Sequence, residues 1–188
     1  MTQAKASARE RLLSTASQLF YQRGFQAVGV DTVVAESGVA KMTLYRHFPS
    51  KDDLIVAYLE RANDAFWKWL ESAITDLNDP KEKLEAIFDA LRQRATSPQC
   101  LGCPFQSTAA EFPDPEHPAH RVALAHKQAI LVRFTALANE AHLQEPEVLA
   151  EQLLMLMDGA WVAARMFGLE NPAIHVARAA RTLITASQ

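Results

Sequence analysis

The chain has few of the features that mark secreted, membrane-spanning or disulfide-stabilised proteins. Only two of its 188 residues are cysteine, which argues against a secreted scaffold held by disulfides. No apolar run approaches the roughly 18 residues that a membrane span needs, and the N-terminus lacks the apolar core of a signal peptide. We therefore expect a cytoplasmic protein that does not enter a membrane.

Strand patterns, internal repeats and low-complexity stretches are also missing from the sequence. Ser, His and acidic residues occur, but not in the arrangement of a known catalytic motif. Apolar residues instead recur at helical spacing, as at Leu12, Ala16 and Leu19. This spacing predicts an all-α fold of about nine helices. The content of 49% hydrophobic residues is ordinary for a globular protein.

Capping residues and prolines indicate where the helices begin. Three of them should open at a polar residue followed by proline, at Asp79-Pro80, Glu145-Pro146 and Asn171-Pro172. The expected helices cover about residues 6–23, 32–37, 41–47, 51–73, 105–112, 119–141, 146–168 and 172–187, with a further helix from residue 80.

Residues 31–51 have the pattern of two short helices joined by a tight turn. Asp31 is expected to cap the first helix with its carboxylate, and Gly38 can adopt the positive φ that ends it. Leu44 and Phe48 would anchor the second helix to a core. The residues left on its outer surface are Lys41, Met42, Thr43, Tyr45, Arg46 and His47. This arrangement is a helix-turn-helix, whose second helix enters the major groove of double-stranded DNA.

The residues GVAKMTLYRHFPSKDDL resemble the signature of TetR-type transcriptional regulators. Together with the preceding helix, the resemblance covers about residues 8–60. It implies a helix-turn-helix DNA-binding domain at residues 1–51 and a helical ligand-binding and dimerisation domain at 52–188. The helix at residues 51–73 would link the two.

The resemblance also implies which side chains contact DNA. Base edges would be met by Lys41, Met42, Thr43 and Arg46, and phosphates by Thr32, Tyr45, His47 and Lys51. For Tyr45, packing against the first helix is an equal alternative, and His47 can be a packing residue or a neutral donor to phosphate. The expected operator is a palindrome read by a dimer.

Charge is distributed unevenly along the chain. Residues 1–51 contain seven Lys and Arg against three Asp and Glu, whereas residues 52–188 contain twelve against nineteen. A basic N-terminal part within a chain of net charge −3 supports a protein that places one end on phosphate.

The helix expected at residues 146–168 is apolar on nearly every side from Leu153 to Phe167. Such a helix has to be buried on more than one side, and in a domain of this size the second partner is expected to be another subunit. The helix at 172–187 also has an apolar stripe. The resemblance implies a homodimer in which these two helices pair with their copies across a two-fold axis.

Regulators of this type usually release DNA when a small-molecule inducer binds the C-terminal domain. The inducer must bind the conformation without operator better, because only differential affinity shifts the equilibrium. The candidate pocket residues are Phe66, Trp67, Phe88, Phe105, Phe112, Phe134, Met155, Trp161 and Met166. Each of them can equally be ordinary core, and Trp161 and Phe105 are the leading candidates.

Cys100 and Cys103 form a C-x-x-C, the spacing of redox dithiols and of half a zinc site. The segment is similar to one found in regulators that sense electrophiles or oxidants, although a packed thiol at a helix start is the plainer alternative. The further residues available to a metal are Glu111, Asp114, His117, His120 and His126. No second pair completes a familiar ligand set, so no metal or cofactor is expected.

Together with what the resemblance implies, these observations predict a ligand-responsive DNA-binding regulator, with repression as the leading mode of action, and not an enzyme. A redox- or electrophile-sensing regulator acting through Cys100 and Cys103 is the alternative. A thiol–disulfide enzyme is disfavoured, because the C-x-x-C lacks the strand–helix setting of thioredoxin-like proteins.

Overall fold

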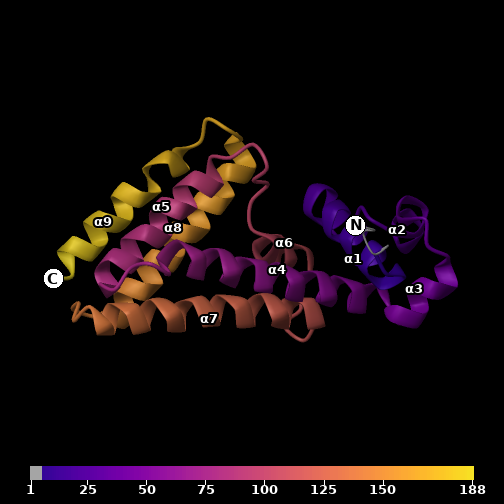
Figure 1. Cartoon of the computed structure of the whole chain (residues 1–188), viewed down its shortest axis with the longest axis horizontal. Coiled ribbons are helices and arrows are strands. Elements are labelled where there is room, and N and C mark those ends of the chain that lie inside the picture. The colour runs from indigo at the N-terminus through magenta and orange to yellow at the C-terminus, as the bar shows by residue number, and fades with distance from the viewer. Residues whose placement is uncertain (1–5) are drawn as a thin grey trace, which may run out of the picture. The chain divides into compact units, whose positions relative to one another are not determined.

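The computed structural model describes residues 6–188, and over that range it consists of nine α-helices, one 3₁₀ turn and no strands (Figure 1). The helices are α1 (Ala8–Arg23), α2 (Val30–Ser37), α3 (Lys41–His47), α4 (Lys51–Ile74), α5 (Pro80–Ala95), α6 (Pro104–Glu111), α7 (Pro118–Glu140), α8 (Pro146–Phe167) and α9 (Val176–Ala186), with the 3₁₀ turn η1 (Pro172–His175) before α9. The predicted all-α fold is confirmed. In the part of the chain described, no helix is long and apolar enough to cross a membrane.

Side-chain caps explain several helix starts. Asp79 accepts a hydrogen bond from the amide of Lys81 at 2.8 Å, and Pro80 occupies the first position of α5, as the sequence predicts. Asn171 accepts from the amide of Ala173 at 3.0 Å, but the turn that it opens is 3₁₀, and α9 begins only at Val176. The sequence prediction that the last helix begins at Pro172 was therefore wrong by four residues, because the chain first forms the 3₁₀ turn η1.

The predicted capping role of Asp31 is wrong. The extended residue before α2 is Gly29, so the helix begins at Val30 and Asp31 lies inside its first turn. Glycine is accepted at this position without a side-chain hydrogen bond. Asp31 still complements the positive end of the helix dipole, and its carboxylate bonds to Lys41.

The described chain divides into two compact units. The first comprises the residues up to Asn63 together with Pro104–Leu124, and the second comprises Asp64–Cys103 and Ala125–Gln188. Helices α4 and α7 contribute residues to both units. This division concerns packing, whereas the functional boundary at residue 51 stays a prediction.

In the first unit, α1, α2 and α3 pack against one another around a small core (Figure 1). Gly38 has φ 63° and ends α2 in the left-handed conformation, which turns the chain into α3. An aromatic cluster lies beside this core: the ring of Phe25 is 5.3 Å from Phe20, 5.9 Å from Tyr58 and 5.6 Å from Phe112. The cluster joins α1 and α4 to the segment that follows α6.

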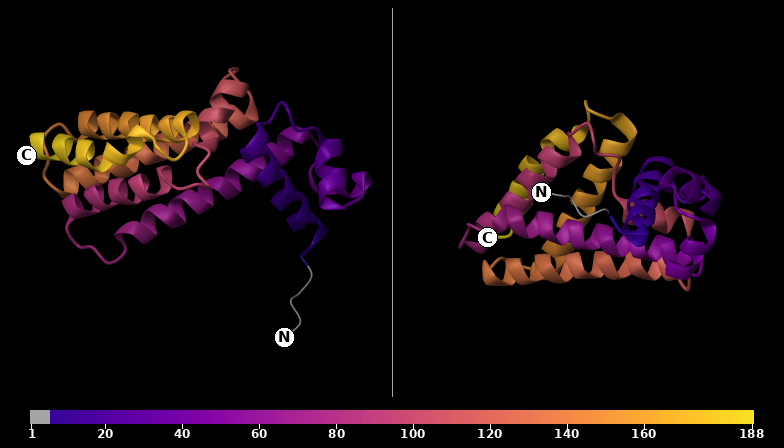
Figure 2. Two further views of the ribbon diagram at one scale, coloured as in Figure 1. Left: turned by 90° about the horizontal axis from the view of Figure 1, so that it is seen from above. Right: turned by 45° about the vertical axis from the view of Figure 1, so that its right-hand side comes forward.

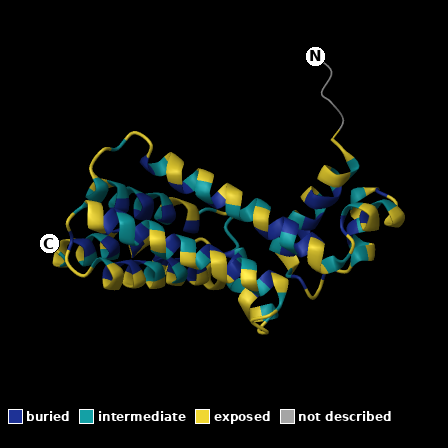
Figure 3. Ribbon diagram, turned by 90° about the horizontal axis from the view of Figure 1, so that it is seen from below, coloured by how far each residue is buried: buried dark blue, intermediate teal, exposed yellow. Residues whose placement is uncertain are grey.

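In the second unit, α5 packs against α8 and α9 (Figure 2). Its predicted apolar stripe is buried, including Leu84, Ile87 and Leu91 at 0% exposure. Phe88 lies 5.8 Å from Phe134 of α7, and both rings are fully buried. Buried residues face the neighbouring helices, while the outer faces are exposed (Figure 3).

Candidate nucleic-acid interface

The recognition helix α3 is fixed by two apolar side chains. Leu44 is 0% exposed and Phe48 is 2% exposed, so this side of the seven-residue helix is held in the core of the first unit. The guanidinium of Arg9 covers the Phe48 ring at 5.2 Å. A helix this short would not be stable alone, and these contacts keep it folded.

The opposite side of α3 presents the residues that the sequence predicts there. Met42 is 81% exposed and Tyr45 is 41% exposed, and Lys41 and Arg46 are exposed as well. The half-buried predicted contacts are Thr43 and His47 on this helix and Thr32 on α2. The face therefore combines two cations with an apolar thioether and hydroxyl groups.

Lys41 has a partner on the neighbouring helix. Its Nζ lies 2.6 Å from Oδ1 of Asp31, across the turn that joins α2 and α3. The hydrogen bond and the charge of Asp31 raise the pKa of Lys41. The ammonium is therefore held at the start of the recognition helix.

Lys51 also has an intramolecular partner, which the sequence did not indicate. Its Nζ donates a hydrogen bond to the carbonyl oxygen of Phe25 at 2.7 Å, and the residue is half-buried. An ammonium has three donors, so this bond leaves two for other acceptors. Phosphate contact by Lys51 stays a prediction.

Glu111 at the end of α6 binds the loop that follows α1. Its Oε2 accepts hydrogen bonds from the amides of Phe25 at 2.9 Å and Gln26 at 2.7 Å. Gly24 has φ 81°, and a Cβ on it would lie 2.9 Å from Oε1 of Glu111. Sequence reasoning considered Glu111 only as a metal ligand, because no local pattern joins residues 86 positions apart.

The histidines of the Pro-rich segment also contact protein groups. Nε2 of His117 lies 3.6 Å from Oδ2 of Asp52, and its ring stacks on Phe112 at 4.3 Å. Nδ1 of His120 is 2.8 Å from the carbonyl oxygen of Phe112. Within residues 6–188, no three His, Cys, Asp or Glu side chains lie together as metal ligands.

His126 lies in the second unit and is 3% exposed. Its ring meets Phe66 edge-on at 4.7 Å. Burial, and to a smaller extent the charge of Lys127, lower the pKa of His126 to about 3. The imidazole is therefore neutral at physiological pH.

Cys100 and Cys103 form no disulfide. Cys103 is buried, and the Nζ of Lys127 lies 3.8 Å from its sulfur. The same ammonium forms an ion pair with Asp158 of α8. Lys127 and Asp158 are functional candidates that sequence reasoning missed, since they lie on α7 and α8, far along the chain.

The predicted pocket residues occupy several different places. In the second unit, Phe66 and Trp67 are in ring contact, and Trp161 lies 6.1 Å from Trp69. The buried Phe105 and the half-buried Phe112 belong to the first unit.

Met155 and Met166 are exposed on the surface of α8, at 74% and 72%. They are therefore not core residues of the second unit, and their predicted place in the wall of a ligand pocket stays a prediction. Phe167 and Ile174 are further exposed apolar residues, at 60% and 48%.

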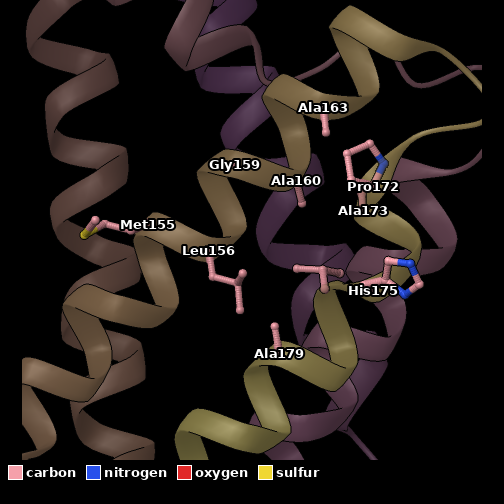
Figure 4. Close-up of a pocket in the computed structure, with 10 residues that line it drawn as sticks. Met155, Leu156, Gly159, Ala160, Ala163, Pro172, Ala173, His175 and Ala179 are labelled. Carbon is pink, nitrogen blue, oxygen red and sulfur yellow. The ribbon is translucent and has the colours of Figure 1, made fainter.

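A groove of about 380 Å³ runs between α8 and the segment formed by η1 and α9 (Figure 4). Leu156 of α8 and Ala179 of α9 point towards each other across it, and Met155, Ala163 and Val176 also line it. Its lining is almost entirely apolar.

Comparison with known proteins identifies the family. Residues 12–58 match the bacterial regulatory proteins of the tetR family, and residues 80–183 match the tetracyclin repressor-like C-terminal domain. The chain belongs to the TetR family. The predicted resemblance and the predicted function of a DNA-binding transcriptional regulator are thereby confirmed.

Similar proteins extend over the whole chain. A TetR-family transcriptional regulator from Streptomyces coelicolor superposes with a TM-score of 0.90 at 35% identity, covering 96% of this chain and 95% of the other. The regulator YxaF of Bacillus subtilis is 25% identical over 170 residues, 89% of this chain and 88% of its own.

The transcriptional activator FasR of Mycolicibacterium smegmatis is 37% identical over 82 residues, which is 44% of this chain and 37% of that protein. These relatives are named as transcriptional regulators and not as enzymes. TetR-family proteins bind DNA operators, act as dimers and respond to small-molecule ligands.

Proposed function

We propose that the chain is a repressor that binds a palindromic operator as a homodimer and leaves it when an inducer binds. The exposed face of α3 is the observation that carries this proposal. Leu44 and Phe48 anchor the helix, so that its polar side is presented rigidly to the major groove.

The chemistry of this face suits direct reading of bases. Lys41 and Arg46 can donate to the acceptors of guanine, and Met42 and Thr43 can meet a thymine methyl group. Arg46 forms no ion pair with any residue from 6 to 188, which leaves its five donors available. The proposed phosphate contacts are Thr32, Tyr45, His47 and Lys51.

The proposed dimer interface is formed by α8 and α9. Met155, Val162 and Met166 give α8 an exposed apolar side, and the groove beside α9 offers space for a partner's side chains. Exposed apolar patches mark interaction sites, and two-fold homodimers are the commonest oligomers, so a second copy of the chain is the proposed partner. Two recognition helices would then read half-sites about one helical turn apart, or a multiple of it.

The inducer is proposed to bind the second unit, among the buried aromatic side chains of Phe66, Phe88, Phe134 and Trp161. It would have to favour the conformation that fits the operator less well.

Selection from a pool of random DNA duplexes tests the proposal. The expected product is a palindrome bound by two chains, as measured by analytical ultracentrifugation with the selected duplex. Arg46→Ala should lower affinity for this duplex at least tenfold and relax the sequence preference at one position in each half-site. Selection of a non-palindromic sequence by a single chain would refute the dimeric mode.

A second candidate function is electrophile sensing through Cys103, and the ammonium of Lys127 at 3.8 Å favours it. The sulfur would add to the β-carbon of an α,β-unsaturated carbonyl compound. A C–S bond forms there, and the thiol proton ends on the α-carbon.

The reaction with N-ethylmaleimide tests this candidate. In Cys100→Ser, where Cys103 is the remaining thiol, mass spectrometry should find an adduct on Cys103 that forms more slowly when Lys127→Met is added, and this adduct should lower affinity for the selected duplex. Cys100→Ser is the control and should keep the response. An unmodified Cys103, or full DNA binding after modification, would exclude this function.

A further inference from the structure

Asp31 and Lys41 form an ion pair that bridges the two helices of the helix-turn-helix. Asp31 lies in the first turn of α2, Lys41 is the first residue of α3, and the two charged atoms are 2.6 Å apart. Their side chains are 80% and 51% exposed. An ion pair so open to solvent contributes little to folding stability, so its effect is expected on what Lys41 binds.

We propose that Asp31 is a specificity-determining residue for DNA, which acts by holding the ammonium of Lys41. The inference rests on the proposed function, in which Lys41 lies at the front of the recognition helix. Asp31 is a positioning residue in this scheme, because it acts on DNA through Lys41.

The carboxylate restricts where the lysine ammonium can go. A lysine side chain has a flexible four-carbon stem, and its point charge settles on any phosphate within reach. The bond to Asp31 limits these conformations, so that less freedom is lost when the ammonium meets a matching base. On matched DNA, the ammonium can bind a base while it stays bonded to Asp31. On unmatched DNA, it has to break the bond to Asp31 before it can neutralise a phosphate, so that it gains less. The ion pair therefore favours matched over unmatched DNA.

Asp31 has a second effect that has to be separated from the first. Its negative charge repels phosphates of every sequence to the same extent, which lowers affinity for matched and unmatched duplexes alike. This repulsion cancels in the ratio of the two affinities. A change in the ratio of the affinities for matched and unmatched DNA reports the positioning of Lys41. An equal change in both affinities leaves this ratio constant and reports charge alone.

Glu36 provides a matched control. It lies on the same helix, but its ion pair is with Arg23, whereas Lys41 pairs with Asp31. Oε1 of Glu36 is 3.4 Å from Nη1 of Arg23. Both members of that pair are about half exposed. Glu36→Gln removes one negative charge from α2, as Asp31→Asn does, but leaves the partner of Lys41 in place.

The experiment uses the full chain, a duplex selected by the wild type from a random pool, and a scrambled duplex of equal length. Dissociation constants are measured for the wild type, Asp31→Asn, Glu36→Gln, Lys41→Met and the double variant Asp31→Asn/Lys41→Met. Asp31→Asn should bind the scrambled duplex about threefold more tightly, and its affinity ratio should fall on the order of fivefold. Glu36→Gln should keep the wild-type ratio. In the Lys41→Met background, Asp31→Asn should leave the ratio unchanged.

Three results would overturn the inference: an unchanged ratio in Asp31→Asn, an equal fall in Glu36→Gln, or a fall that persists in the Lys41→Met background. Thermal unfolding of each variant verifies that the helix-turn-helix domain is still folded. If the wild type selects no sequence at all, the proposed function fails together with the inference. If it selects one and Asp31→Asn behaves like the wild type, only the inference fails.

Discussion

Two lysines of the proposed DNA-binding surface have partners within the chain. Lys41 is bound to Asp31 on the surface, whereas Lys51 is half-buried and donates to the carbonyl oxygen of Phe25. The first bond is solvent-exposed, while the second satisfies a backbone acceptor beside a buried ring. The same side-chain type is therefore expected to serve recognition alone at position 41, and both folding and phosphate binding at position 51.

Lys51→Ala separates these roles. Loss of a charge-assisted hydrogen bond should lower the free energy of unfolding by about 1–2 kcal/mol. Because Lys51 is also a proposed phosphate contact, affinity for all duplexes should fall and the salt slope should decrease by about one unit. Urea denaturation and DNA titration at several salt concentrations measure the two effects, with the exposed Lys68→Ala of α4 as control. A loss of stability with an unchanged salt slope would assign Lys51 to folding alone.

His126 makes stability depend on pH. Its pKa is about 3 when folded and near 6.5 when unfolded, so the unfolded chain binds the proton more tightly and stability falls as pH drops below 6.5. Between pH 7 and pH 5, this single group should cost about 2 kcal/mol. Denaturation of the wild type and of His126→Gln at both pH values measures the difference. An equal pH dependence in the two proteins would contradict the assignment.

At the scale of elements, α8 has two unlike sides. One packs on α5 and α9, and the other exposes Met155, Val162 and Met166. The sequence predicted an apolar helix that needs a second partner, and the exposed side is consistent with that expectation. Only the structure could show which residues remain uncovered, because a helix that is apolar on every side has no polar face to mark its orientation.

Met166→Glu tests the proposed dimer interface. A carboxylate placed in an apolar contact loses its hydration without gaining a partner, so the dimer should dissociate at least a hundredfold more readily. Sedimentation equilibrium measures the dissociation constant. Val132→Glu is the matched control, since Val132 is 70% exposed on α7. Equal dissociation constants for wild type and Met166→Glu would place the interface elsewhere.

The helices also show which features of the fold can be predicted from the sequence. Local signals gave most helix limits, because caps, prolines and apolar spacing act within one or two turns. Contacts between distant positions were beyond such signals: the bond of Glu111 to the α1–α2 loop and the proximity of Lys127 to Cys103 both depend on packing. The capping role predicted for Asp31 was wrong because its side chain has two possible partners, a backbone amide and Lys41, and the sequence favours neither.

For the whole molecule, the proposed mode of action depends on joining two weakly binding surfaces. A seven-residue recognition helix makes few base contacts, and a dimer converts the second contact into an intramolecular event at high effective concentration. The basic N-terminal residues and the acidic remainder of the chain suit such an arrangement, since only one part of each subunit is attracted to phosphate.

Shortening the operator tests this dependence. A duplex with one half-site should bind at least a hundredfold more weakly than the full palindrome, because the linkage between the two subunits is lost. Fluorescence anisotropy with both duplexes measures the ratio. In Met166→Glu the two duplexes should bind almost alike, whereas a large ratio in that variant would show that the subunits cooperate without α8.

The carboxylate of Glu111 occupies the space that a side chain on Gly24 would need. A residue other than glycine would be strained by the φ of 81° and would also push the carboxylate off the amides of Phe25 and Gln26. Positions 24 and 111 are therefore expected to change together as such chains diverge in evolution. This covariation would record a contact that neither position reveals on its own.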